Sequence, residues 1–234
     1  MKIKTVTTWN DRLYQQYAHR FMDTYNWDFP LIVYNEDVDM YNIIPQCRDF
    51  VEKWSHVSSS NYRYDAVRFC YKVYAYTHEI LNSDSTTDGI IFVDADSVFH
   101  NPIDSSWVKK HIHRDDCITT YLGRGDEYSE CGFIYFNMKH PEIKNFARRM
   151  QYEYNTGMVF NRKEWHDSYI FDCVRKMFEG DGIKSYSIGD EQWGENGHVQ
   201  ARSILGTIYD HTKGPRKVAG ISPENALLFA RNSI

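Results

Sequence analysis

The chain has few of the features that mark secreted or membrane-spanning proteins. Its five cysteines are an odd number without a C-x-x-C pair, so neither a disulfide framework nor a zinc site is expected. No stretch reaches the roughly 18 apolar residues of a membrane span. The start of the chain lacks the apolar segment of a signal peptide, and no N-x-S/T acceptor for glycosylation occurs. We therefore expect a soluble cytoplasmic protein.

An excess of positive charge is also missing. The 27 Lys and Arg residues against 32 Asp and Glu residues give a formal charge of −5. This balance argues against a protein that coats nucleic acid, although it leaves room for a local basic groove. The 234 residues contain no repeat, low-complexity tract or convincing linker. We expect one domain over residues 1–234, long enough for a sizeable core.

Apolar patterning indicates an α/β protein. In the first hundred residues, expected strands alternate with expected helices, which is typical of a parallel α/β sheet. The strands expected there span residues 2–8, 29–34 and 89–93, with helices over 10–25 and 64–81 and a short amphipathic segment over 49–54. In the second half we expect strands over 117–122, 132–136 and 205–209, and helices over 142–154, 164–178 and from 223 onward.

Two carboxylates follow the most apolar of these strands. Gly89–Val93 is a continuous apolar run, typical of a fully buried strand, and it leads directly into Asp94-Ala95-Asp96. Residues i and i+2 of an extended segment point to the same side, so both acids face one crevice at the carboxyl end of the strand. Close like charges need a cation there. The pattern predicts a divalent metal that carries a phosphorylated substrate.

A second polar segment lies far along the chain, at residues 209–217. It contains His211 and three cations, Lys213, Arg216 and Lys217, around the Gly214-Pro215 pair. An imidazole can complete a metal shell that two carboxylates begin, and Lys and Arg can neutralise a diphosphate leaving group. The Gly-Pro pair allows a close backbone approach and a rigid bend. Alone, this segment is equally typical of a basic surface loop.

Together the two segments resemble the GT-A nucleotide-sugar glycosyltransferases, especially glycosyltransferase family 8. That family combines an apolar strand, a D-x-D motif and a late H-x-x-G-x-x-K-P loop. Residues 94–96 and 211–217 match this pattern, with Val218 in place of the final proline. The resemblance implies a single-domain, Rossmann-like mixed sheet flanked by helices. Its nucleotide-sugar-binding half would span about residues 1–100. The acceptor-binding half, with the metal and diphosphate loop, would span about 101–234.

The resemblance also implies a donor site. Asp94, Asp96 and His211 would bind Mn²⁺ or Mg²⁺, and a nitrogen ligand favours Mn²⁺. The metal would hold the diphosphate of a nucleotide sugar, most simply a UDP-sugar. The other residues implied to contact the donor are Thr7, Thr8, Trp9 and Asn10 after the first strand, Asp65 and Arg68 on a helix, and Ala95, Lys213, Gly214 and Lys217 near the diphosphate. For Arg68, a surface salt bridge is an equally good interpretation.

The catalytic residues are expected in the second half of the chain. Family 8 members carry an acidic D-Q pair near the reacting carbon, which makes Asp190, Glu191 and Gln192 candidates for acceptor activation or sugar binding. An inverting enzyme needs a carboxylate base, whereas a retaining one needs a polar group below the anomeric carbon. Asp167 is a further candidate, although residues 165–168 are also typical of a helix cap.

The strand over residues 129–137 resembles the family strand that lines the sugar and acceptor pocket. Glu130-Cys131 stands there where the family has Asn-Ser or Asn-Ala. This departure leaves the donor sugar open.

Two acceptors are compatible with the sequence. One is a hydroxyl on a saccharide or glycoconjugate. The other is the hydroxymethyl group of a modified pyrimidine in DNA, as in phage-type DNA glycosyltransferases. For DNA, basic pairs at 148–149, 162–163 and 175–176 would track phosphates, together with Lys213, Arg216 and Lys217. An extruded base would stack on Trp165, Tyr169 or Trp193. The stereochemistry and the oligomeric state stay open.

Two other functions remain possible. Residues 94–98 also satisfy the D-x-D-x-[T/V] motif of HAD-type phosphohydrolases, with Asp94 as nucleophile, Asp96 as acid/base and Thr119-Thr120 as the second motif. Against this, about 90 residues with two strands of their own precede the motif, and Gly194 stands where the last acid is needed. A non-enzymatic saccharide-binding module would use the aromatic surface, but it leaves the paired acids without a role.

Overall fold

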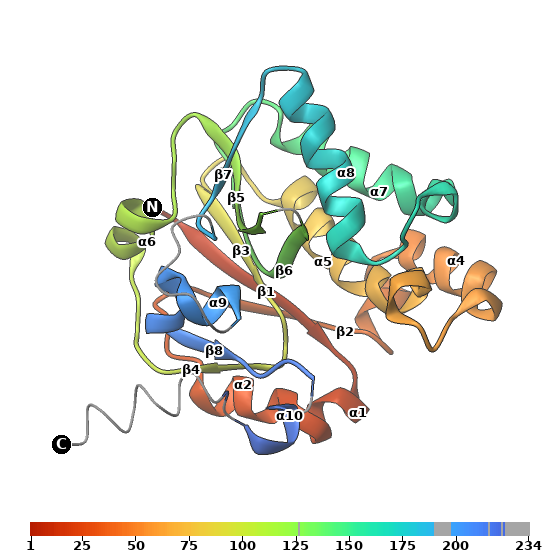
Figure 1. Cartoon of the computed structure of the whole chain (residues 1–234), viewed down its shortest axis with the longest axis horizontal. Helices are drawn as coiled ribbons and strands as arrows, with labels where there is room; N and C mark the ends of the chain where they lie inside the picture. The colour runs from red at the N-terminus through yellow and green to blue at the C-terminus, as the bar shows by residue number, and fades with distance from the viewer. Residues whose placement is uncertain (126, 190–197, 215, 221, 223–234) are drawn as a thin grey trace.

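The computed structural model describes residues 1–125, 127–189, 198–214, 216–220 and 222. Its centre is a six-stranded mixed sheet in the order β2-β1-β3-β6-β5-β7 (Figure 1). The strands of this sheet are β1 (Ile3–Trp9), β2 (Leu31–Asn35), β3 (Gly89–Val93), β5 (Cys117–Arg124), β6 (Glu127–Asn137) and β7 (Lys184–Ser187). A separate two-stranded sheet pairs β4 (Ser97–Phe99) with β8 (Tyr209–His211).

Strand direction determines which residues meet at the edge of the main sheet. β1 pairs in parallel with both β2 and β3, so the carboxyl ends of these three strands share one edge. β6 runs antiparallel to β3, with Val93 opposite Phe133, and the Asp94 N–H donates to the Gly132 carbonyl at 3.0 Å. The beginning of β6 therefore lies at the same edge as the ends of β1, β2 and β3. The expected α/β fold with a mixed sheet is confirmed.

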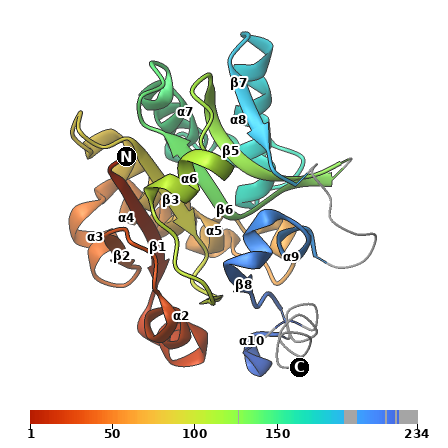
Figure 2. The same cartoon turned by 90° about the vertical axis from the view of Figure 1, so that its left-hand side faces the viewer.

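Helices cover both faces of the sheet (Figures 1 and 2). The longer ones are α4 (Pro45–Trp54), α5 (Ala66–Asn82), α7 (Ile143–Asn155) and α8 (Asp167–Gly180), and they pack together on one face. The shorter ones are α1 (Asp11–Leu13), α2 (His19–Thr24), α3 (Asp39–Ile43), α6 (Ser105–His111), α9 (Val199–Arg202) and α10 (Arg216–Ala219). A π-helical turn (Tyr14–Ala18) joins α1 to α2, and 3₁₀ turns span Ser55–Val57, Tyr62–Tyr64, Met158–Asn161 and Ile204–Thr207.

The central strand β3 explains why its sequence is apolar throughout. Ile90 and Phe92 belong to the core beneath α5 and α7, whereas Ile91 and Val93 belong to the core on the opposite face. A strand covered on both sides buries every side chain, so hydrophobic residues do not alternate with polar ones.

The expected elements differ most from the structure near the end of the chain. The strand expected over residues 205–209 is wrong, because a 3₁₀ turn ends at Thr207 and the strand β8 begins only at Tyr209. The short strands β4 and β7 and the helix α6 were not expected. β4 is a three-residue strand whose partner lies about 110 residues away, so no local pattern reveals it. The helix expected from residue 223 lies outside the described residues.

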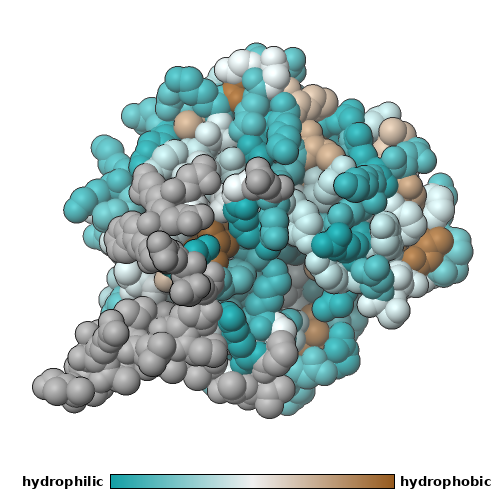
Figure 3. Space-filling model, viewed as in Figure 1, coloured by the Kyte–Doolittle hydropathy of each residue, from teal (hydrophilic) through white to brown (hydrophobic). Residues whose placement is uncertain are grey.

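None of the helices in the described part of the chain is both long and apolar enough to cross a membrane. The face drawn in Figure 3 is mostly hydrophilic, with apolar residues in small groups. Single exposed apolar residues of this kind are normal on a folded protein.

A buried ionic cluster fastens α5 to the first two strands. Glu79 on α5 accepts hydrogen bonds from Lys4 on β1 at 2.6 Å, from Tyr34 on β2 at 3.0 Å and from Ser83 at 3.0 Å. Burial alone would raise the pKa of Glu79, but these three donors outweigh it and hold the pKa below its ordinary value of 4.5. The ionised carboxylate thus stabilises the folded state.

We expect Glu79→Gln to lower the free energy of unfolding near pH 7 by about 1–3 kcal/mol, because charged hydrogen bonds are lost. Since the pKa is lowered in the folded state, this stabilisation is present above the ordinary pKa and is lost as the pH falls through the folded-state value. Urea unfolding of both proteins near pH 7 and near pH 3 tests this. Glu52→Gln, on the exposed face of α4, is the control. A stability difference that does not shrink in acid would contradict the assignment.

Candidate active site

A cleft of about 1120 Å³ opens at the edge where β1, β2 and β3 end and β6 begins. Side chains from both ends of the sequence line it, including Thr8 and Asn10 after β1, Asp94 and Asp96 after β3, and His211 from β8. The expected location, beyond the carboxyl ends of the parallel strands, is where open α/β sheets bind ligands.

Asp94, Asp96 and His211 converge in this cleft. The Nε2 atom of His211 lies 3.1 Å from Asp96 Oδ1 and 3.7 Å from Asp94 Oδ2. The pairing of β4 with β8 causes this approach, because it sets Ser97 opposite His211 and lets the Thr212 N–H donate to the Asp96 carbonyl at 2.9 Å. Backbone hydrogen bonds therefore hold together side chains that are more than 110 residues apart.

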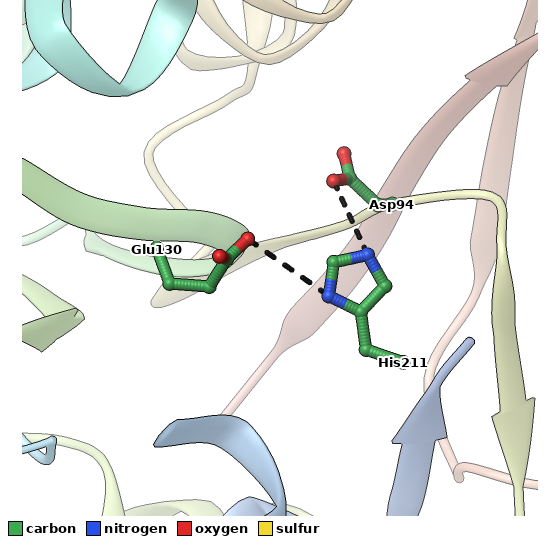
Figure 4. A group of neighbouring side chains, drawn as sticks. All are labelled: Asp94, Glu130 and His211. Carbon is green, nitrogen blue, oxygen red and sulfur yellow. Dashed lines mark ion pairs between the residues drawn. The ribbon is translucent and has the colours of Figure 1, made fainter. Parts of the chain in front are cut away.

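Glu130 faces the other nitrogen of the same imidazole (Figure 4). Its Oε1 atom lies 3.9 Å from His211 Nδ1, a buried atom without a hydrogen-bond partner among the described residues. Ligand atoms of Asp94, Glu130 and His211 lie within 4.8 Å of one another, as a shared metal ion would require. The sequence analysis noted Glu130 only as a departure from a family pattern. Glu130 reaches this edge because β6 runs antiparallel to β3 and begins here.

Three lysines accompany the buried acids. Lys72 of α5 contacts Asp94 at 2.9 Å and Asp167 at 2.7 Å. Lys217 lies 2.9 Å from Asp96, and Lys213 lies 2.7 Å from Glu130. Because an isolated buried charge is costly, each of these ion pairs lets the protein keep a carboxylate below the surface.

The charges of the cluster shift the titration of its members. Burial raises the pKa of Asp94, and Lys72 and His211 offset this only in part. Burial would also raise the pKa of Asp96, but His211 and Lys217 outweigh it and hold that pKa far below its usual range. For His211, burial favours the neutral ring, yet the charges of Asp96, Glu130 and Asp94 leave its pKa raised. The three carboxylates thus favour the charged form of the ring that lies among them.

These donors suit a hard divalent cation. Carboxylate oxygens are the preferred ligands of Mg²⁺ and Mn²⁺, and an imidazole nitrogen favours Mn²⁺. The Nε2 atom of His211 points toward the two aspartates. Its Nδ1 atom, which has no hydrogen-bond partner among the described residues, points toward Glu130. A ligating histidine is neutral, so a metal held here would need the unprotonated form of His211.

The structure separates the expected donor-binding residues into two groups. Thr8, Asn10, Arg68, Ala95, Lys213, Gly214 and Lys217 line the cleft. Thr7 and Trp9 do not, because alternate residues of β1 point to opposite sides, and Trp9 packs in the core against Tyr14 and Phe21. Asp65 is also directed elsewhere, since its carboxylate caps α5 by accepting from the Arg68 N–H at 3.3 Å.

The side chain of Arg68 is exposed at the cleft, with its guanidinium 5.5 Å from the centre of the Phe69 ring. Within the described residues no carboxylate pairs with it, which leaves its charge available to a ligand.

Of the expected catalytic residues, Asp167 lies at the cleft. It is buried at the first turn of α8 and paired with Lys72, which links it to Asp94. His166 is the N-cap of that helix and accepts from the Tyr169 N–H at 3.3 Å. His166 therefore caps the helix, while the next residue, Asp167, lines the cleft. Asp190, Glu191 and Gln192 lie outside the described residues.

Glu36 is a second cleft residue that the sequence analysis did not identify. It follows β2, and its carboxylate accepts from Thr8 Oγ1 and from Asn10 Nδ2, each at 3.0 Å. The side chain is buried, and burial raises the pKa of Glu36 from 4.5 to about 7. The signal in the sequence was its place just after the strand expected over residues 29–34.

No protein-family model and no curated protein sequence matches the chain. Solved structures with a similar fold are glycosyltransferases. One is involved in the glycosylation of the major capsid of PBCV-1, and it superposes with a TM-score of 0.52 over 98% of this chain and 100% of its own, at 8% identity. The galactosyltransferase LgtC, solved with donor and acceptor sugar analogs, gives a TM-score of 0.50 over 99% and 96%, at 9% identity.

The bifunctional glycosyltransferase WbbM gives a TM-score of 0.50 at 12% identity, over 98% of this chain but 51% of its own. The chain therefore has the GT-A glycosyltransferase fold, which confirms the fold that the sequence resemblance implied.

Gly132 on β6 tests the placement of His211. A methyl group added at Gly132 would lie 2.5 Å from Cε1 and 2.7 Å from Nδ1 of His211. We expect Gly132→Ala to displace the imidazole and weaken Mn²⁺ binding by about 10-fold to 100-fold. The free Mn²⁺ signal in an electron paramagnetic resonance titration measures this. Gly180→Ala, where no atom lies within 4 Å of the added methyl group, is the matched control. Equal Mn²⁺ affinity in both variants would show that His211 is not a ligand.

The raised pKa of Glu36 predicts that the free energy of unfolding depends on pH. The pKa of Glu36 is raised from 4.5 to about 7 in the folded state. Between these pH values the folded protein therefore keeps the carboxyl proton that the unfolded chain loses. Stability therefore falls as the pH rises through this window and then levels off. At about 1.4 kcal/mol per pKa unit, we expect the wild type to lose up to about 3 kcal/mol relative to Glu36→Gln between these pH values. Urea unfolding near pH 5 and near pH 8 tests this, and parallel pH profiles would contradict it.

Proposed function

We propose that the protein is a metal-dependent glycosyltransferase. It moves a sugar from a nucleoside-diphosphate sugar, most simply a UDP-sugar, to a hydroxyl acceptor on a saccharide or glycoconjugate. The observation that carries this proposal is the convergence of Asp94, Asp96 and His211 at the carboxyl edge of a GT-A sheet. Lys213 and Lys217 beside them supply the positive charge that a diphosphate leaving group needs.

In this proposal, Asp94, Asp96 and His211 hold Mn²⁺ or Mg²⁺, with Glu130 on the far side of the imidazole. When bound, the cation neutralises both phosphates and stabilises the leaving nucleotide. Lys217 and Lys213 are paired with Asp96 and Glu130 in the structure. Both ammonium groups thus lie beside the acids of the proposed metal site, where they would supply positive charge to the diphosphate.

Asp167 is the described candidate for orienting the acceptor hydroxyl, because it lines the cleft and Lys72 holds it near Asp94. Asp190, Glu191 and Gln192 remain candidates for acceptor activation or sugar binding from the family resemblance. A base must reach the proton that it removes to within hydrogen-bond distance.

Several contacts favour a saccharide over DNA as the acceptor. Arg149 and Arg162 both pair with the buried Glu153, at 2.6 and 2.7 Å, and Arg175 pairs with Asp172 at 2.9 Å. In each of the pairs 148–149, 162–163 and 175–176, one arginine therefore forms an ion pair with a carboxylate of the protein instead of facing a phosphate backbone.

The aromatic residues give the same indication. Trp165 packs edge-to-face on Tyr64 and Phe160, so it is not a free platform for an extruded base. By contrast, Tyr62 and Tyr128 line the cleft and meet through their hydroxyl groups at 2.8 Å. Tyrosine rings of this kind suit the apolar face of a sugar while their hydroxyl groups hydrogen-bond to it.

The other two functions have less support. If the protein were a phosphohydrolase, with Asp94 and Asp96 as its catalytic acids, the place of His211 between them would have no explanation. The GT-A fold does not favour a phosphohydrolase either. A saccharide-binding module would have no use for three carboxylates around one buried imidazole.

The proposal predicts that Asp96→Ala and His211→Ala abolish sugar transfer without unfolding the protein, since each removes a ligand of the metal. Thermal unfolding with a panel of nucleotide sugars, with and without Mn²⁺, identifies a donor by its Mn²⁺-dependent stabilisation. We expect both variants to lose that stabilisation.

Asp181→Ala, which removes an exposed carboxylate at the end of α8, is the control and should behave as the wild type. Full transfer by either active-site variant would refute the metal assignment. Phosphate release from a simple phosphomonoester without any acceptor would instead support the phosphohydrolase.

A further inference from the structure

The two lysines beside the proposed metal site are held in different ways. Lys213 pairs with Glu130, and its side chain is 51% exposed. Lys217 pairs with Asp96 at 2.9 Å, and its side chain is 28% exposed. The ammonium group of Lys217 also lies 4.3 Å from the centre of the Tyr17 ring. Lys217 is therefore held between a carboxylate and an aromatic ring.

The backbone of Lys217 is fixed as well. The guanidinium group of Arg20 donates to the Lys217 carbonyl at 2.5 Å, and the Lys217 N–H donates to the Gly214 carbonyl at 3.1 Å. A methyl group added at Gly220 would lie 3.3 Å from the same guanidinium group, so Arg20 is close to the end of α10 too. With its backbone held, the position of the Lys217 ammonium group depends on the contacts of the side chain.

Tyr17 belongs to the π-helical turn between α1 and α2. In this turn the His19 N–H donates to the Tyr14 carbonyl, five residues back. Such turns are rare and occur frequently at functional sites. Ala18 and Phe21 of the same helical stretch are buried in the core, whereas Tyr17 lines the cleft. The core thus anchors the backbone that presents the Tyr17 ring to Lys217.

An aromatic ring holds an ammonium group differently from a carboxylate. The face of the ring attracts the cation but carries no net charge. Burial raises the pKa of Tyr17, so its phenol is neutral near pH 7 and leaves the charge of Lys217 uncompensated. An ammonium group has three N–H donors, and Asp96 accepts from one side of it. The ring therefore restricts Lys217 and leaves donors for the oxygens of a phosphate.

We propose that Tyr17 is a positioning residue of the donor site, whose ring holds the Lys217 ammonium group where the diphosphate binds. The inference rests on the proposed function, since it requires Lys217 to contact the diphosphate of the donor. Tyr17 acts through Lys217 and not through the nucleoside. Its effect is therefore expected with a diphosphate that carries neither a base nor a sugar.

Calorimetric titration with inorganic diphosphate at a saturating Mg²⁺ concentration tests the proposal. We expect Tyr17→Leu to weaken diphosphate binding by about 3-fold to 10-fold, because the cation–π contact is lost. Tyr17→Phe keeps the ring and should bind within about twofold of the wild type. The control is Gln15→Leu, an exposed residue of the same π-helical turn, which should bind as the wild type does.

A double-mutant cycle shows whether Tyr17 acts through Lys217. Lys217→Met removes the ammonium group and should itself weaken diphosphate binding. If the ring acts on that group alone, adding Tyr17→Leu to Lys217→Met has no further effect. A loss of packing would instead weaken binding equally in both backgrounds. Because the comparison is made within each background, it holds even if Tyr17→Leu lowers the melting temperature.

The outcomes separate this inference from the proposed function. If the wild type does not bind diphosphate, or if Lys217→Met binds it as the wild type does, the proposed role of Lys217 falls and the inference falls with it. If Lys217→Met weakens binding but Tyr17→Leu does not, or if the effects of the two substitutions add, only the role of Tyr17 is overturned. Weaker binding of UDP to Tyr17→Leu with unchanged diphosphate binding would also overturn it, since the ring would then contact the nucleoside.

Discussion

The short antiparallel pairing of β4 with β8 is the constraint on which the rest of the site depends. Three pairs of residues in register set His211 opposite Ser97, next to the Asp94-Ala95-Asp96 segment. This contact brings a late loop to the end of the central strand and encloses the Nε2 atom of His211 between two carboxylates. The same pairing places Lys213 and Lys217 at Glu130 and Asp96. Without it, the acids after β3 would be a solvated strand end.

Electrostatic balance explains how a protein keeps so many acids in one cleft. Each buried ion costs several kcal/mol unless it is paired. Here three lysines compensate the acids after β3 and at the start of β6, and these acids raise the pKa of His211. A divalent cation in this cluster would need the histidine in its neutral form, because a ligating imidazole is unprotonated.

The sequence was sufficient where local pattern determines structure. The apolar run of β3 and the two acids after it are adjacent in the chain, so a buried strand with acids at its end could be predicted. The extended conformation expected for Asp94 to Asp96 is wrong, because these residues form a turn between β3 and β4. His211 required a family resemblance, since nothing local connects residue 211 with residue 94. Glu130 and Glu36 could not be assigned, because their roles depend on the direction of β6 and on the pairing of β1 with β2. Thr7 and Trp9 failed as cleft residues, since the alternation of side chains along β1 separates them from Thr8 and Asn10.

The ionised form of Glu36 is unfavourable in the free protein, because the carboxylate is buried. The acids that would hold a metal are stabilised in the free protein by lysines, so their burial alone does not reveal whether a ligand completes them. Glu36 has only neutral donors, and its pKa of about 7 records a free-energy cost that the free protein bears when the group is ionised. Selection for stability alone therefore does not explain a buried acid at this place in the cleft, where Thr8 and Asn10 orient it.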